Sequence, residues 1–122
     1  MQDFVGAKGV IPAEQLAKLS ERSNWQGLVQ LAGHFGAIVV VGWALSVTGS
    51  SWLSLPLFML LGVLLNYLYA PTHECDHFTA FKSRWLNIWV ARLCGFIIFN
   101  PSAHHRWTHF AHHRNTQDWH KD

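Results

Sequence analysis

Residues 23–73 read SNWQGLVQLAGHFGAIVVVGWALSVTGSSWLSLPLFMLLGVLLNYLYAPTH and contain no Lys, Arg, Asp or Glu. A bilayer core about 30 Å thick is crossed by roughly 20 apolar residues in a helix. The stretch therefore predicts two membrane-spanning helices, at about residues 28–47 and 52–69. Between them, Thr48-Gly49-Ser50-Ser51 has the composition of a tight turn. We predict an all-α integral membrane protein built on a transmembrane helical hairpin.

The rest of the composition supports this class. Half of the 122 residues are hydrophobic and 13% are charged, whereas soluble domains carry about a quarter. The alternative, a buried hairpin in a soluble protein, would leave too little polar sequence to cover both helices. The formal charge of +2 comes from scattered Lys and Arg, which argues against nucleic-acid binding. His34 and Asn66 are expected to form helix–helix hydrogen bonds.

The flanks of the hairpin predict its orientation. Residues 1–23 form a polar segment, with a short helix expected after Pro12 and none of the features of a secretory signal peptide. Basic residues lie on both sides of the hairpin, whereas the turn has none. They are Lys8, Lys18 and Arg22 before it, and Lys82, Arg84 and Arg92 after it. The positive-inside rule then places both flanks, and everything from Thr72 onward, in the cytoplasm.

Residues 85–99, WLNIWVARLCGFIIF, are apolar but short for a span and carry Arg92 near the middle. We predict a helix that lies in the membrane interface or packs against the hairpin, in preference to a third crossing. Its predicted apolar face consists of Leu86, Val90, Leu93 and Ile97, and Asn87 and Arg92 point away from it. Asn100 is predicted to cap a further helix that starts at Pro101. Cys75 and Cys94 lack CxxC spacing and are predicted to be reduced thiols.

Eight of the nine histidines fall between His73 and His120. His73 and His77 are four residues apart, so both imidazoles could reach one metal ion from a single helix face. On a second helix, four histidines fall within an arc of about 100°. These are His105, His109, His112 and His113. Such a stripe is poor core packing but suits a metal site, because neutral imidazole binds Fe, Zn, Cu and Ni.

Three less specific interpretations stay open. The histidines could form a solvated tail with adventitious metal affinity. His104 and His120, taken singly, have the character of surface residues. His105 could be an additional ligand or a partner that hydrogen-bonds to a ligand.

The two motifs HECDH (73–77) and HFAHH (109–113), placed after a membrane hairpin, resemble the histidine boxes of the membrane-bound fatty-acid desaturases. The runs THECDHFTAFKSRWLN (72–87) and HRWTHFAHHRNTQD (105–118) are similar to bacterial desaturases of rhizobitoxine biosynthesis. The resemblance covers nearly the whole chain and implies a bacterial inner-membrane protein. Residues 24–122 would be the N-terminal part of the desaturase domain.

The resemblance implies a centre of two Fe ions that uses O2 to desaturate a fatty-acid or acyl-lipid substrate, with a ferredoxin or cytochrome b5-type electron donor. The family's iron ligands correspond to His73, His77, His109, His112 and His113. A third HxxHH box, which completes the family's site, is missing from these 122 residues, so the chain alone is expected to be inactive. We hypothesise that Glu74, Asp76 or Asp118 accepts the free N–H of a ligand histidine.

Two other functions fit the same motifs. Hydroxylases and ketolases use such boxes to insert oxygen, and substrate placement decides the outcome. A non-catalytic metal-binding membrane hairpin is the alternative outside enzymology.

Overall fold

A computed structural model describes residues 11–120, and within this range all the regular secondary structure is helical. The helices are α1 (Ala13–Leu19), α2 (Asn24–Thr48), α3 (Ser54–Asn66), α4 (Tyr69–Asp76), α5 (Arg84–Ile97) and α6 (Ser102–Asn115). The predicted all-α fold is confirmed for these residues. The short helix expected after Pro12 is α1, whereas Lys8 and the other residues before position 11 lie outside the described range.

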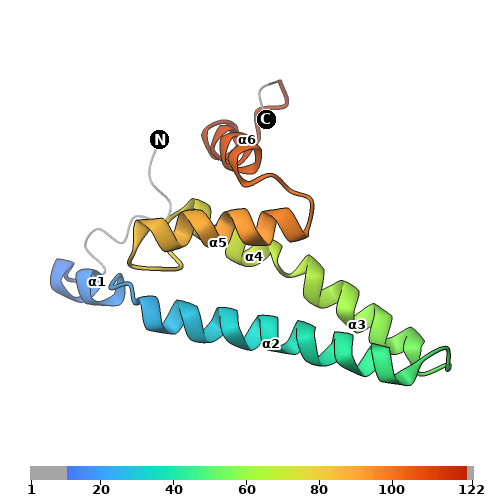
Figure 1. Cartoon of the computed structure of the whole chain (residues 1–122). Helices are drawn as coiled ribbons and strands as arrows, with labels where there is room; N and C mark the ends of the chain where they lie inside the picture. The colour runs from blue at the N-terminus through green and yellow to red at the C-terminus, as the bar shows by residue number, and fades with distance from the viewer. Residues whose placement is uncertain (1–10, 121–122) are drawn as a thin grey trace.

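Helices α2 and α3 form the predicted hairpin (Figure 1). The Ser23 hydroxyl accepts a hydrogen bond from the Gln26 N–H and caps α2, and Gly49, at φ +60°, follows its last residue. A side-chain hydrogen bond joins the two helices, because the His34 imidazole Nε2 lies 2.8 Å from the Leu64 carbonyl oxygen. The predicted turn and the helix–helix role of His34 are therefore confirmed.

The outer surface of the hairpin is apolar. Val39, Val40, Phe58 and Met59 each expose more than half of their side chains. By length and composition, two stretches of the described chain could cross a membrane, Ala13–Thr48 and Ser54–Asp76. Apolar side chains that face outward on such helices are suited to lipid. Helices α5 and α6, which meet at an angle of 103°, could count as a third, broken span by the same criteria.

The boundary after the second span differs from the prediction. Helix α3 ends at Asn66, and α4 begins at Tyr69, so the helix that carries the first histidine pair starts before Pro71. Pro71 is tolerated there because N–H groups in the first helical turn have no intrahelical acceptor to lose. The break at Tyr67 and Leu68 lets α4 change direction under α5 (Figure 1).

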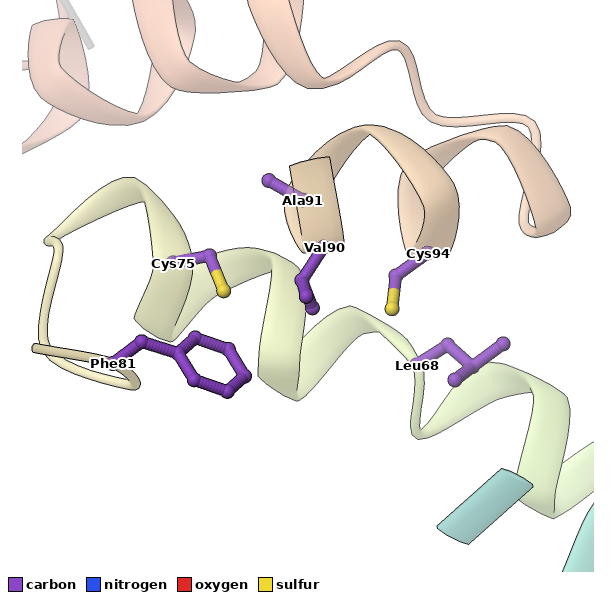
Figure 2. Close-up of a cluster of buried hydrophobic side chains, with 6 residues drawn as sticks. All are labelled: Leu68, Cys75, Phe81, Val90, Ala91 and Cys94. Atoms are coloured by element: carbon purple, nitrogen blue, oxygen red, sulfur yellow. The ribbon is translucent and has the colours of Figure 1, made fainter. Parts of the chain in front are cut away.

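The buried core lies where α4 and α5 pack together (Figure 2). It contains Leu68, Cys75, Phe81, Val90, Ala91 and Cys94. Both cysteines are free thiols, as predicted. The core therefore holds together the loop at 77–83 and the two helices on either side of it, and places the first histidine pair beside α6.

The buried face of α5 differs from the predicted apolar face. Asn87, predicted to point away from that face, is 1% exposed, whereas Leu93, predicted to lie on it, is 49% exposed. The Asn87 amide accepts from the Phe81 N–H at 3.2 Å and donates to the Phe81 and Ser83 carbonyls at 2.9 and 3.0 Å. Hydrophobic periodicity misses this position because the loop supplies backbone groups that need a polar partner.

We expect Asn87→Ala to reduce the free energy of unfolding by about 2 kcal/mol, because it leaves buried backbone groups of Phe81 without partners. Thermal or denaturant unfolding in detergent would measure the loss. Asn66→Ala, at an exposed position, is the control and should be close to neutral. Equal stability of the two variants would contradict the role assigned to Asn87.

Helix α6 begins at Ser102, one residue later than predicted. Pro101 occupies the capping position, and Asn100 instead donates its N–H to the Gly95 carbonyl at 2.7 Å. This tight connection folds α6 away from α5 and into contact with α4. The two histidine-bearing helices are thereby neighbours.

Candidate metal centre

Four histidines converge between α4 and α6. They are His73 and His77, at the end of α4, and His109 and His113, on α6. One ring nitrogen of each lies within 4.8 Å of the others. Both predicted i,i+4 pairs therefore face each other, and this group is called the four-histidine cluster below.

The contacts inside the cluster point the ring nitrogens at one place. His109 Nε2 lies 2.8 Å from His77 Nε2 and 3.1 Å from His113 Nε2. The His73 and His109 ring centroids are 4.3 Å apart. A neutral His109 with its proton on Nδ1 has one lone pair on Nε2, which can accept a hydrogen bond from a neighbouring ring. When the neighbouring rings also carry their protons on Nδ1, their Nε2 lone pairs are free for a metal ion.

The surroundings of His77 and His109 favour their neutral forms. Burial, together with the neighbouring imidazoles of His73, His113, His77 and His105, lowers the pKa of His109 to about 4. The pKa of His77 is also lowered, first by burial and then by His73 and His113. At neutral pH these rings are therefore unprotonated, which is the form that binds metals.

The donor set fits a first-row transition metal. Metal–nitrogen bonds of about 2.0–2.1 Å place tetrahedral ligands roughly 3.4 Å apart, so small side-chain rotations would suffice here. Imidazole donors suit Zn, Cu, Fe and Ni. The arrangement can hold one such ion from two helices.

His105 lies beside the four-histidine cluster, but the described hydrogen bonds of its ring are to Asp76 and Tyr69. Its Nδ1 is 2.6 Å from the Asp76 carboxylate and its Nε2 is 3.2 Å from the Tyr69 hydroxyl. Its ring stacks on His109, with centroids 5.4 Å apart and planes 10° apart. Arg106 holds the same region by donating to the Asp76 backbone carbonyl at 2.7 Å. The described hydrogen bonds of the His105 ring therefore join it to Asp76 and Tyr69, and its contact with the cluster is the stacking on His109.

The three acidic residues predicted to accept an N–H of a ligand histidine lie in different surroundings. Asp76 is 3% exposed and pairs with His105, not with a cluster histidine. Glu74 accepts from the Thr79 hydroxyl at 2.6 Å and lines a groove of about 880 Å³ between α2 and α4. Asp118 accepts from the His120 N–H at 3.1 Å. The described contacts do not pair Glu74 or Asp76 with a histidine of the cluster.

His112 is not among the histidines that converge. It is exposed and lines a separate pocket with Thr116, Gln117, Asp118 and Trp119. Its position at one edge of the predicted arc explains this, because α4 faces the other side of α6. The ring centroids of His112 and His113 are 6.1 Å apart.

Tyr69 is the residue of this region that sequence reasoning missed. Its position one helical turn before His73 was the available signal, because i and i+4 side chains lie on one face.

One family model and two known proteins are similar to this chain. A family model described as fatty acid desaturase matches residues 50–122. An sn-1 acyl-lipid omega-3 desaturase (ferredoxin) from Nostoc sp. is 33% identical over 85 residues, which are 67% of this chain and 24% of that protein. The Synechocystis sp. protein of the same name is 36% identical over 75 residues, 61% of this chain and 21% of that one.

The chain thus spans about a quarter of the length of these relatives. No solved structure matches significantly. The relatives do not single out the rhizobitoxine-type group, which stays a prediction. The family match extends over both histidine motifs and over the helices that bring four of their imidazoles together. This chain belongs to the fatty acid desaturase family.

Proposed function

We propose that this chain is part of a membrane-bound, O2-dependent, non-haem di-iron desaturase that acts on acyl lipids. The observation that carries the proposal is the four-histidine cluster at the end of a lipid-facing hairpin. The names of the two relatives support an acyl-lipid substrate and a ferredoxin donor, and they give no support to a cytochrome b5 donor.

In this proposal His73, His77, His109 and His113 would hold iron, and His112 would be a fifth ligand. Iron, when bound, supplies the O2-dependent removal of two hydrogens from an unactivated CH2–CH2 unit, which side chains alone cannot perform. The packing of α4 against α6 brings four of the imidazoles together, and burial favours the neutral forms of His77 and His109. Five histidines are too few for two irons, so we expect activity only where further ligands join them.

We also propose that the flanks of the hairpin and both histidine motifs lie on the cytoplasmic side, and that α5 lies in the interface. Trp85, Trp89 and Phe96 on α5 are exposed, and the Arg92 guanidinium lies over the Trp89 ring at 5.0 Å. Such a mixture of aromatic and basic groups suits the level of the lipid headgroups.

Cysteine labelling would test this orientation. An impermeant maleimide added outside intact cells should label Ser50→Cys and leave Thr116→Cys unlabelled until the membrane is opened. Both positions are exposed, and the native cysteines are buried. Labelling of Thr116→Cys from outside would reverse the topology.

The decisive experiment for the function is expression of the complete reading frame that contains this chain, with a ferredoxin system, followed by analysis of host lipids. A new double bond and bound iron are expected. The same frame with His77→Ala and His109→Ala is the control and should give neither. Hydroxylated or keto products would instead indicate an oxygen-inserting relative.

The metal content of the chain itself addresses the alternative of a non-catalytic metal binder. Four convergent imidazoles would also suit a single tetrahedral zinc ion. A purified protein that always holds one zinc and never iron, with no lipid product, would favour that alternative.

A further inference from the structure

Tyr69, His105 and Asp76 form a hydrogen-bonded chain that the iron ligands do not require. The Tyr69 hydroxyl lies 3.2 Å from His105 Nε2, and His105 Nδ1 lies 2.6 Å from the Asp76 carboxylate. His105 is 8% exposed and Asp76 is 3% exposed. Buried polar groups of this kind need an explanation.

The order of the three groups fixes the direction of the hydrogen bonds. A carboxylate can only accept, so His105 Nδ1 carries the proton that it shares with Asp76. The Nε2 of the neutral imidazole is then an acceptor, and the Tyr69 hydroxyl donates to it. The phenol therefore has a base within hydrogen-bond reach, and a buried carboxylate lies behind that base to stabilise positive charge.

The same phenol touches the four-histidine cluster. The Tyr69 and His73 ring centroids are 6.0 Å apart, and those of Tyr69 and His105 are 5.1 Å apart. His105 in turn stacks on His109. Tyr69 is thus next to one proposed ligand directly and next to a second through a single ring. About 45% of Tyr69 is exposed, so its ring is not enclosed within the described chain.

We propose that Tyr69 is a redox-active tyrosine, which gives one electron to the oxidised metal centre while its phenolic proton moves to His105. The inference rests on the proposed function in one respect, because that centre is the one-electron oxidant in the cell. It goes further in assigning a redox role to a residue outside the ligand set.

The Tyr69 O–H bond breaks, the electron leaves for the oxidant, and the proton forms a new N–H bond at His105 Nε2. A neutral phenoxyl radical and an imidazolium paired with Asp76 remain. A one-electron donor of the ferredoxin class returns the electron, and His105 returns the proton. Without the base, oxidation would pass through a strongly acidic phenol cation, which is much less accessible.

A test on the chain itself is available because it contains only two tyrosines, Tyr67 and Tyr69. The chain, loaded with redox-inert zinc in detergent, would be oxidised by flash-generated ruthenium(III) tris-bipyridine and frozen for electron paramagnetic resonance. Ring-deuterated tyrosine would separate tyrosyl from tryptophanyl signals. Tyr67→Phe leaves Tyr69 as the only tyrosine, and Tyr69→Phe leaves Tyr67, which is a matched control two residues away.

We expect Tyr67→Phe to keep the tyrosyl radical, with a solvent deuterium isotope effect, and Tyr69→Phe to form it at least about tenfold more slowly. In the Tyr67→Phe background, His105→Gln should slow oxidation of Tyr69 by a similar factor and abolish the isotope effect. Glutamine can still accept the hydrogen bond but is a far weaker base. Cobalt(II) absorption spectra would confirm that each variant still folds its cluster.

Equal radical yields from Tyr67 and Tyr69, or oxidation of Tyr69 that does not respond to His105→Gln, would overturn the inference. Iron binding is measured separately on the unmodified protein. A protein without iron whose Tyr69 still oxidises through His105 would contradict the di-iron proposal and support the proton-coupled step. Iron binding with no Tyr69 radical would support the di-iron proposal and contradict the proton-coupled step.

Discussion

His109→Ala should weaken metal binding by more than about 100-fold, because loss of a partner behind a ligand already costs about 10–100-fold. His109 is the centre of the cluster. Its Nε2 lies within 3.1 Å of the Nε2 atoms of both His77 and His113, and its ring is 4.3 Å from that of His73. Removing it leaves the remaining three imidazoles with a gap on the α6 side.

The measurement is titration of the purified chain with cobalt(II) or zinc(II), followed by elemental analysis after gel filtration. His104→Ala is the matched control, because His104 is also on α6 but is exposed and outside the cluster. It should bind metal as the unmodified chain does. If both variants lost affinity equally, the histidines would be acting as a non-specific tail, and the metal centre assigned here would be wrong.

The fold was largely predictable, because the membrane hairpin rests on one strong physical signal. An uncharged run of that length leaves few alternatives to two apolar helices, and a Gly-Ser turn marks where they reverse. The α5 face was not predictable in the same way. Asn87 is buried because the loop around Phe81 needs an amide, and a loop's backbone groups cannot be located from periodicity.

The candidate metal centre was also predictable only in part. Spacing alone placed His73 with His77 and His109 with His113, because each pair is one helical turn apart. What spacing could not supply is the direction of α6 relative to α4. That direction turns His112 outward, brings Asp76 to His105 and not to a ligand, and adds Tyr69. These contacts depend on the 103° angle between α5 and α6.

Gly95→Ala should destabilise the chain by about 3 kcal/mol and also reduce its metal affinity. Gly95 is buried where α5 approaches the connection to α6, and a Cβ there would overlap the Asn100 backbone oxygen. Its own carbonyl accepts the Asn100 N–H at 2.7 Å, so the two segments cannot simply separate. Relief of the overlap would have to move Asn100 and the start of α6, which carries half of the cluster.

The loss of stability expected for Gly95→Ala is opposite in sign to the change that helix propensity predicts. Helix propensity alone predicts that replacing a helical glycine by alanine is stabilising, by up to about 1 kcal/mol. Gly62→Ala, on α3 with nothing within 4 Å of its Cβ position, should follow that rule and leave metal binding unchanged. Thermal unfolding in detergent and cobalt(II) titration of both variants would decide. A Gly95→Ala chain as stable and as metal-competent as Gly62→Ala would mean that the close turn between α5 and α6 does not position the histidines.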